Sequence, residues 1–222
     1  MSGTAALPAA PPRERETPSW RLVATLALAG GLAGLLIVLV FGWAQPRILA
    51  HQEETLGAAV REVLGAPASV ERLFVHGGAL VDRLPAGADT LAAERVFLGR
   101  DAAGAPVGFA VLGAEPGFQD VIRLIFGYDP RSRKLLGMKV LESKETPGLG
   151  DKIEKDTAFV GAFRGVAAPP AGVKPGAGTG AANEVDMITG ATISSRAVVG
   201  IIARRIEKLD PLLRAHLPGG GR

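Results

Sequence analysis

Hydroxyl-bearing and small residues alternate over one short stretch near the carboxyl end of the chain. The stretch covers residues 186–195 and reads Asp-Met-Ile-Thr-Gly-Ala-Thr-Ile-Ser-Ser. Its hydroxyl groups belong to Thr189, Thr192, Ser194 and Ser195. The apolar pattern that follows is helical, and the first turn of a helix offers unpaired N–H groups and the positive end of its dipole to an anion. Gly190 and Ala191 leave room for close approach, so the stretch predicts a phosphate-binding helix start.

The same stretch has a second interpretation that needs no ligand. Threonine is common at the N-cap of a helix, where its hydroxyl accepts a bond from a backbone N–H. Thr189 or Thr192 could serve only in this way, with the small residues simply packing tightly. No lysine follows the glycine as in a P-loop, and no G-x-G-x-x-G stands at a strand-to-helix turn. From the residues alone, both interpretations stay open.

A second candidate segment, Glu-Thr-Pro-Gly-Leu-Gly, covers residues 145–150. Pro147 followed by Gly148 predicts a sharp turn that bares backbone N–H groups. Such donors can stabilise charge on a reduced cofactor, and Leu149 can pack against a flat ring. An ordinary turn between a strand and a helix is the alternative.

Other chemistries find little support in the composition. The chain of 222 residues has no cysteine, which excludes disulfides, cysteine-ligated clusters and thiol nucleophiles. Its three histidines are dispersed, and neither paired carboxylates nor a Ser-His-Asp order stands out, so we expect no metal site and no catalytic side chain. A net charge of +3 without basic clusters and only 5% aromatic residues argue against a nucleic-acid partner.

The pattern D-x-x-[ST]-G-A-T-x-[ST] at residues 186–194 resembles the covalent-FMN motif of the FMN-binding domain in RnfG and NqrC proteins of membrane redox complexes. The resemblance implies that Thr192 carries FMN through a phosphoester, delivered from FAD by a Mg²⁺-dependent flavin transferase. It also implies that Asp186 helps the transferase to recognise the site. Thr189 stands where serine is common in the family.

Two further segments extend the resemblance. Residues 145–150 are similar to the E-T-P-G-L-G segment of RnfG-type proteins, and residues 116–122 are similar to a P-G-Y-x-G-x-I stretch in which Phe118 here replaces tyrosine and Asp120 replaces glycine. The cofactor-binding residues that the resemblance implies are Thr192, Gly190, Ala191, Ser194, Ser195, Thr189, Asp186, Glu145, Thr146, Gly148, Leu149 and Phe118.

The resemblance implies an electron-carrying subunit of a membrane-bound Rnf-type complex, which couples electron transfer between ferredoxin and NAD to ion translocation. Its partners would be the other subunits of that complex. An NqrC-type subunit of a sodium-pumping NADH:quinone reductase is one alternative. A membrane-anchored module that binds an anionic ligand or an assembly partner without redox work is another.

An uncharged apolar run between Arg21 and Arg47 predicts a membrane helix. At about 1.5 Å per residue, it spans roughly 35 Å, enough to cross a hydrocarbon core of about 30 Å. Trp20 and Trp43 lie at its ends, as expected of interfacial aromatic residues. The run is too long for a typical signal peptide and lacks an A-x-A-like cleavage site, so a retained anchor is favoured over a cleaved signal.

Three arginines precede the run, which indicates a cytoplasmic N-terminus. Together with the resemblance, this implies a single-pass protein of a bacterial inner membrane with its FMN domain on the periplasmic side.

The remaining elements follow from local patterns. Helices are expected at residues 51–64, 156–163 and 193–209, the last ended by Asp210-Pro211. Strands are expected on both sides of the turn signals at residues 101–104 and 129–132.

The expected fold class is α+β, with one N-terminal transmembrane helix and an FMN-binding domain of antiparallel sheet and packed helices. The expected divisions are a disordered cytoplasmic tail at 1–18, a transmembrane helix at 19–46, a juxtamembrane helix at 47–66, the FMN-binding domain at 67–210 with a flexible loop at 167–182, and a tail at 211–222.

Overall fold

The computed structural model describes residues 18–85, 87–89 and 93–217. The chain forms two compact units, Met1–Gln52 and Glu53–Arg222. Nearly all of the tail expected at residues 1–18, and the end of the tail expected at 211–222, lie outside the described residues.

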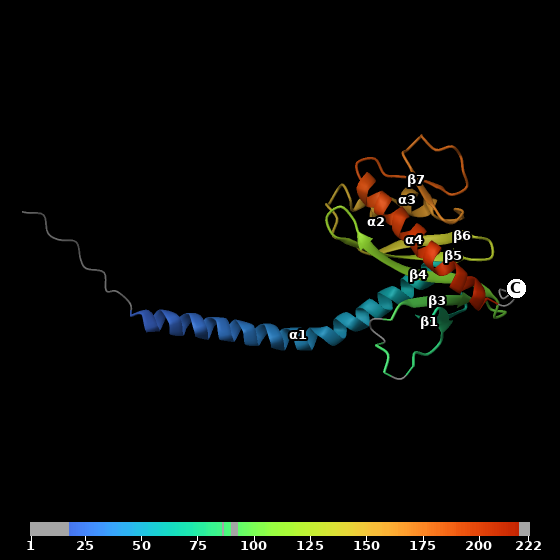
Figure 1. Cartoon of the computed structure of the whole chain (residues 1–222). Helices are drawn as coiled ribbons and strands as arrows, with labels where there is room; N and C mark the ends of the chain where they lie inside the picture. Colours follow the sequence, from blue (N-terminus) through green and yellow to red (C-terminus); the bar gives the residue numbers. More distant parts are fainter. Residues whose placement is uncertain (1–17, 86, 90–92, 218–222) are drawn as a thin grey trace, which may run out of the picture. The chain divides into compact units, whose positions relative to one another are not determined.

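The first long element is helix α1, Ser19–Val63 (Figure 1). Its apolar part has a mean hydropathy of 2.5 and is fully exposed, so the helix is long and apolar enough to cross a membrane. The expectation of a separate helix at 47–66 is wrong, because α1 runs without interruption through Pro46. A proline removes only one backbone bond within the helix, and strong helix-forming sequence lies on both sides. The helix ends as expected, with Gly65 and Ala66 at positive φ.

The second unit is built on one antiparallel sheet with the strand order β2-β1-β3-β4-β5-β6. The strands are β1 (Ser69–His76), β2 (Ala79–Val81), β3 (Arg95–Arg100), β4 (Pro106–Pro116), β5 (Val121–Asp129) and β6 (Lys134–Glu142). Long strands at the centre alternate side chains between two buried faces. Leu124 and Phe126 belong to the larger core, whereas Ile125 between them belongs to a smaller core on the other face.

Each face of the sheet is covered by a helix. Helix α4 (Thr192–His216), red in Figure 1, packs on the face of the larger core, chiefly over β4 and also against β2 and β5. On the other face, Ala59, Val60 and Val63 from the last turns of α1 pack with Phe97 and Ile125. Antiparallel strands with helices outside the sheet confirm the expected α+β class.

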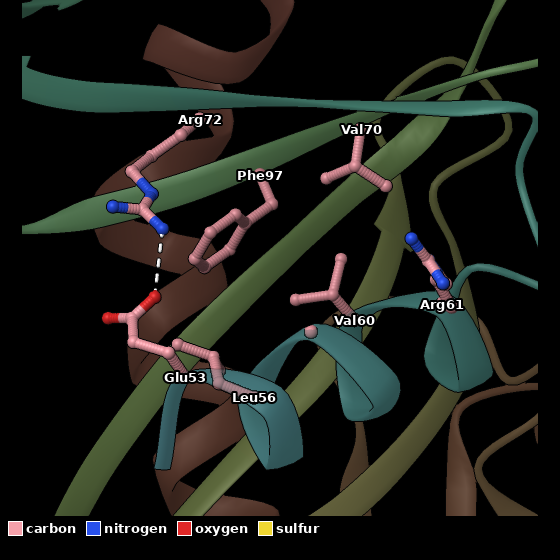
Figure 2. Close-up of a pocket in the computed structure, with 8 residues that line it drawn as sticks. Glu53, Leu56, Val60, Arg61, Val70, Arg72 and Phe97 are labelled. Atoms are coloured by element: carbon pink, nitrogen blue, oxygen red, sulfur yellow. Dashed lines mark hydrogen bonds and ion pairs between the residues drawn. The ribbon is translucent and has the colours of Figure 1, made fainter. Parts of the chain in front are cut away.

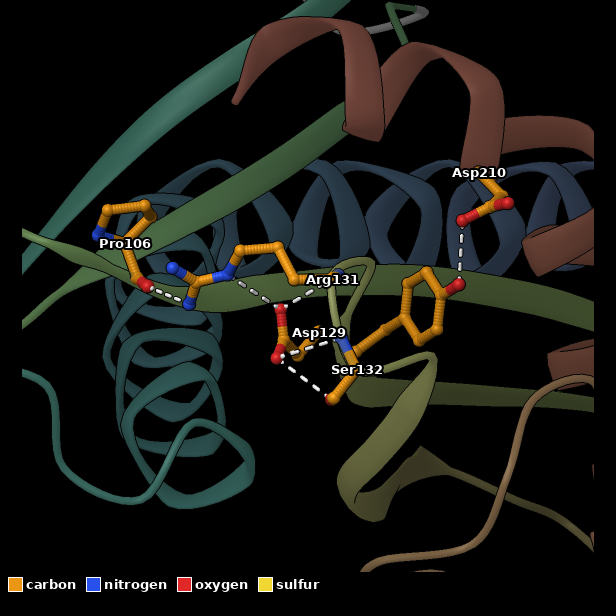
Figure 3. A network of polar contacts seen from close by, with 6 residues as sticks. Pro106, Asp129, Arg131, Ser132 and Asp210 are labelled. Atoms are coloured by element: carbon orange, nitrogen blue, oxygen red, sulfur yellow. Dashed lines mark hydrogen bonds and ion pairs between the residues drawn. The ribbon is translucent and has the colours of Figure 1, made fainter. Parts of the chain in front are cut away.

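Aspartate side chains build the two predicted hairpin turns. Asp101 accepts bonds from the N–H groups of Ala103 and Ala105 between β3 and β4. Between β5 and β6, the Asp129 carboxylate accepts from the Arg131 N–H at 3.1 Å and the Ser132 hydroxyl at 2.8 Å (Figure 3). Both turns follow from the local chemistry of aspartate, which bonds backbone N–H groups two residues ahead.

Short elements lie between β6 and α4. Helices α2 (Lys152–Lys155) and α3 (Thr157–Ala162) are followed by strands β7 (Ala171–Val173) and β8 (Glu184–Asp186). The α3 prediction is confirmed, whereas α2 has too few residues for its pattern to be seen. Strand β7 pairs in parallel with β8, so the segment expected to be a flexible loop at 167–182 contains a short strand.

The end of α4 also differs from expectation, since Pro211 lies inside the helix. Leu213 is fully buried in the last turns, and the Asp210 carboxylate accepts a bond from the Tyr128 hydroxyl at 2.6 Å (Figure 3). Arg214 also binds Asp210 across one helical turn. These tertiary contacts outweigh the backbone bond that the proline removes, so the prediction that Asp210-Pro211 ends the helix is wrong.

Candidate functional site

Helix α4 begins at Thr192, one residue before the predicted start at residue 193, and its first turn is open. The N-cap residue is Ala191, which has no side chain able to bond the turn. Among the described residues, no acceptor faces the N–H groups of Thr192, Ile193 or Ser194. The first backbone bond of the helix is the one from Ser195 N–H to the Ala191 carbonyl. The interpretation that Thr189 or Thr192 merely caps the helix is therefore wrong.

Helix α3 provides a contrast within the same molecule. Its first residue is also a threonine, Thr157, but the preceding Asp156 accepts bonds from the Ala158 and Phe159 N–H groups. That turn is already satisfied by a carboxylate. The open first turn of α4 is thus a feature of its sequence, in which Gly190 at φ 82° and Ala191 stand where a capping side chain would be.

The two serines of the motif are not open donors. Ser194 and Ser195 are 2% and 0% exposed. The Ser195 hydroxyl donates to the Ala191 carbonyl at 2.8 Å and accepts from the Ile188 N–H. The Ser194 hydroxyl donates to Glu145 at 2.6 Å. The expectation that both hydroxyls are free to bind a phosphate is wrong, whereas the half-buried Thr192 has no such partner in the described part of the chain.

Glu145 joins three distant segments of the chain. One carboxylate oxygen accepts from the N–H groups of Phe118 at 2.9 Å and Gln119 at 3.0 Å, with Asp120 at 3.5 Å. The other oxygen accepts from Ser194 at the start of α4. The β4–β5 turn, the segment after β6 and the helix start are thereby held together. These are the three segments that the sequence motifs single out.

The bonds to Glu145 also set its charge. The side chain is only 5% exposed. Burial acts to raise its pKa, but the Ser194 hydroxyl and the backbone N–H groups of the β4–β5 turn outweigh burial, so the pKa of Glu145 lies below its usual value. Glu145 is therefore a carboxylate at neutral pH.

The turn at residues 145–150 is held from within. The Leu149 and Asp151 N–H groups both donate to the Thr146 carbonyl, and Gly148 has φ 79°. The Thr146 hydroxyl donates to Gln119 at 2.8 Å. The sharp turn is confirmed, but the two N–H groups that close it are not bared as expected.

Large apolar side chains stand exposed on each of the three segments. Phe118 is 65% exposed, Leu149 52% and Ile193 54%. Sequence reasoning selected Phe118 and Leu149 but missed Ile193, whose place in the helical pattern suggested a core residue. Asp186 and Thr189 are also exposed, on β8 and on the turn before α4.

A separate groove lies on the other face of the sheet (Figure 2). It has a volume of about 190 Å³, with Val60 and Phe97 on its floor. The Glu53–Arg72 ion pair stands at one end and Arg61 at the other. Phe97 belongs to the smaller core, opposite α4, so this groove is not part of the site around Thr192.

Comparison with known proteins agrees with this geometry. A family model described as "FMN-binding domain" matches residues 117–207, which include all three segments. The G subunit of the ion-translocating oxidoreductase complex of Pseudomonas aeruginosa is 32% identical over 185 residues, covering 79% of this chain and 81% of that protein. The protein of the same name from Methanosarcina acetivorans is 28% identical, with 84% and 92% covered. That from Photorhabdus laumondii is 37% identical over 136 residues, and the match spans only 60% of either protein.

Solved structures share the fold at low identity. The crystal structure of Shewanella oneidensis NqrC superposes with a TM-score of 0.64 at 19% identity, covering 75% of this chain and 99% of that one. The C subunit of a Na⁺-translocating NADH-quinone reductase from Parabacteroides distasonis gives 0.55 at 21% identity, with 75% and 96% covered. The likeness to NqrC thus rests on fold alone, whereas sequence identity favours RnfG. With an FMN-binding domain at residues 117–207, this chain belongs to the RnfG family, the G subunits of ion-translocating oxidoreductase complexes.

Proposed function

We propose that this protein carries FMN covalently on Thr192 and relays electrons within an Rnf-type ion-translocating oxidoreductase. The observation that carries the proposal is the open first turn of α4. Three N–H groups without acceptors among the described residues, together with the positive end of a 25-residue helix, suit a phosphate group. The half-buried Thr192 stands at the first position of that turn, and its hydroxyl forms no hydrogen bond with another described residue.

The covalent step balances as a phosphoryl transfer. The Thr192 Oγ1 atom forms a bond to the phosphorus of the FMN half of FAD, and the bond to the AMP half breaks. The hydroxyl proton is lost and AMP leaves, so no electrons change hands. A flavin transferase with Mg²⁺ would perform this step, with the exposed Asp186 as part of the segment it recognises.

The other site residues fit a flat redox ring better than a small anion. A small anion would need only the helix start, yet apolar Phe118, Leu149 and Ile193 stand exposed on the neighbouring segments. Exposed apolar groups that gather on adjoining segments mark a surface for a ligand or a partner, whereas single ones would not. Bound FMN would supply electron acceptance and release, while these side chains exclude water from its ring.

The rest of the chain fits a membrane-bound carrier. We propose that residues 19–46 of α1 form a retained anchor, with the N-terminus in the cytoplasm and the flavin-bearing domain, residues 67–210, on the periplasmic side of a bacterial inner membrane. In the complex it would work with the other subunits in coupling electron transfer between ferredoxin and NAD to ion translocation. The names of its relatives support membership of an ion-translocating oxidoreductase complex, to which the proposal adds ferredoxin and NAD.

The test is co-production of the full chain with an active flavin transferase, followed by denaturing electrophoresis. A covalent flavin survives denaturation, so the band is expected to fluoresce under ultraviolet light. A dark wild-type band beside a fluorescent control flavoprotein would contradict the proposal and favour an anchored binding module without redox work.

A further inference from the structure

Glu145 is a buried charge that pairs with no cation in the described part of the chain. Among the described residues, no lysine or arginine forms an ion pair with it, and the neighbouring Lys144 lies instead near Asp120 and Glu142. The donors that the described residues offer to Glu145 are neutral: one hydroxyl and the backbone N–H groups of a turn. The site therefore keeps a full negative charge away from water, which is costly for a protein.

Two glycines lie directly against this carboxylate. A Cβ atom at Gly150 would lie 2.6 Å from the Glu145 Oε2 atom and 3.0 Å from the Ser194 hydroxyl. A Cβ atom at Gly117 would overlap the Oε1 atom. Glycine at both positions admits the carboxylate, so its position is fixed from two sides.

A glutamine could accept and donate nearly the same bonds without a charge. One amide oxygen would accept from the turn, and the amide NH₂ would donate to the Ser194 hydroxyl. The need to hold three segments together thus does not explain why the residue is charged. An effect of the negative charge on a group bound nearby would explain why the residue is a glutamate.

We propose that Glu145 is a positioning residue whose charge also lowers the reduction potential of the flavin held at Thr192. The inference rests on the proposed function. Ser194, which binds Glu145 at 2.6 Å, shares the first turn of α4 with Thr192, two residues earlier. This places the carboxylate within roughly 10 Å of the attachment point. Glu145 also binds the N–H of Phe118, whose side chain we propose to cover the flavin ring, so the charge lies near the ring itself. An electron added to the flavin is repelled by a buried negative charge at that range, since no cation of the described chain pairs with the charge and little water screens it.

The size of the effect follows from Coulomb's law. With an effective dielectric constant of about 20, a unit charge at about 12 Å from the ring changes the equilibrium constant for one-electron reduction by about tenfold. A tenfold change corresponds to about 59 mV for one electron. Removal of the charge should shift the potential in the positive direction.

The experiment compares Glu145→Gln with Glu142→Gln in the flavin-loaded full chain. Glu142 is an exposed carboxylate at the end of β6 that pairs with Arg123, so water screens its charge. We expect Glu145→Gln to raise the midpoint potential by about 59 mV, a tenfold change, and Glu142→Gln to leave it unchanged. Equal shifts in the two variants, or none in Glu145→Gln, would overturn the proposal.

Two further measurements separate charge from geometry. Hydrogen exchange of the Phe118 and Gln119 amides, measured in the flavin-free chain, should stay within about twofold of wild type in Glu145→Gln but accelerate at least tenfold in Glu145→Ala. Ser194→Ala removes the hydrogen bond from Ser194 to Glu145 but keeps the charge of Glu145. The reduction potential of the flavin in this variant should therefore not rise. A rise in Ser194→Ala equal to that in Glu145→Gln would assign the shift to geometry and overturn the proposal. Because exchange needs no flavin, failure of flavin attachment would count against the proposed function alone.

Discussion

The hydroxyl of Ser194 donates a 2.6 Å hydrogen bond to the carboxylate of Glu145, which lies 49 residues earlier in the chain. Both side chains are buried, at 2% and 5% exposure. The bond joins the start of α4 to the turn after β6, and Glu145 in turn holds the β4–β5 turn through Phe118 and Gln119. The geometry around Thr192 therefore depends on residues far from it in sequence.

Crowding around Glu145 predicts a large effect of a small substitution. In Gly150→Ala, the added methyl would overlap the Glu145 side chain, and we expect a loss of about 1–3 kcal/mol in the free energy of unfolding. Gly161→Ala is the matched control, because a Cβ atom at that position in α3 meets nothing within 4 Å. The control should be neutral or stabilising by up to about 1 kcal/mol. Urea denaturation measures the free energy of unfolding of each variant. Equal values for the two variants would contradict the packing described around Glu145.

Loss of the N-cap of α3 is expected to lower the free energy of unfolding by less than Gly150→Ala does. Asp156 accepts bonds from two N–H groups of the first turn, so Asp156→Ala should lower the free energy of unfolding by about 1 kcal/mol. Asp120→Ala is a suitable control, since among the described residues the exposed Asp120 side chain bonds the next backbone N–H and lies near Lys144. Thermal denaturation followed by circular dichroism would detect the difference, and no loss in Asp156→Ala would show that the cap does not stabilise α3.

Because the Tyr128 phenol is buried against Asp210, we expect the folded protein to lose stability at alkaline pH. Burial, and then the bond and charge of Asp210, raise the pKa of Tyr128 to about 12. The unfolded chain releases this proton near pH 10, so the stabilisation is complete below pH 10 and is lost as the pH rises towards 12. We expect a loss of about 1–2 kcal/mol over this range.

The titration of the Tyr128 phenol can be followed directly by absorbance, because Tyr128 is the only tyrosine of the chain. Tyrosinate absorbance should appear in the folded protein only well above pH 10, and together with unfolding if the protein denatures first. Tyr128→Phe should lack the part of the alkaline destabilisation that this hydroxyl causes. A normal titration near pH 10 in the folded protein would show that the phenol is not buried against Asp210.

The membrane anchor predicts the side of the membrane on which the flavin domain lies. A reporter enzyme that is active only outside the cytoplasm, fused to the C-terminus, should be active in the full chain. Deletion of residues 19–46 should abolish this activity, because the apolar run between Arg21 and Arg47 would be lost. Activity of a cytoplasm-only reporter at the same position would reverse the proposed orientation.

The elements that sequence could predict are those set by neighbours in the chain. The Asp101 and Asp129 turns follow from one side chain and the N–H groups just after it. The start of α4 at Thr192 follows from small and polar residues ahead of a helical apolar pattern. Local chemistry is enough in each case.

The features that sequence missed depend on tertiary contacts. Pro211 stays inside α4 because Leu213 and Asp210 are anchored in the core. Strand β7 forms in a segment of alanine, glycine and proline because its backbone pairs with β8, which needs no side-chain pattern. The bond between Ser194 and Glu145 has no local signal at all, since either residue could equally be exposed.

The central claim is that one hydroxyl holds one FMN, and intact-mass measurement of the flavin-loaded chain tests it most directly. Thr157→Ala is the matched control, because Thr157 also begins a helix but one whose first turn Asp156 already caps. Wild type and Thr157→Ala, each co-produced with the transferase, should gain the mass of one FMN less one water. Thr192→Ala should keep the mass of the bare chain. An FMN adduct of full yield in Thr192→Ala would contradict the account.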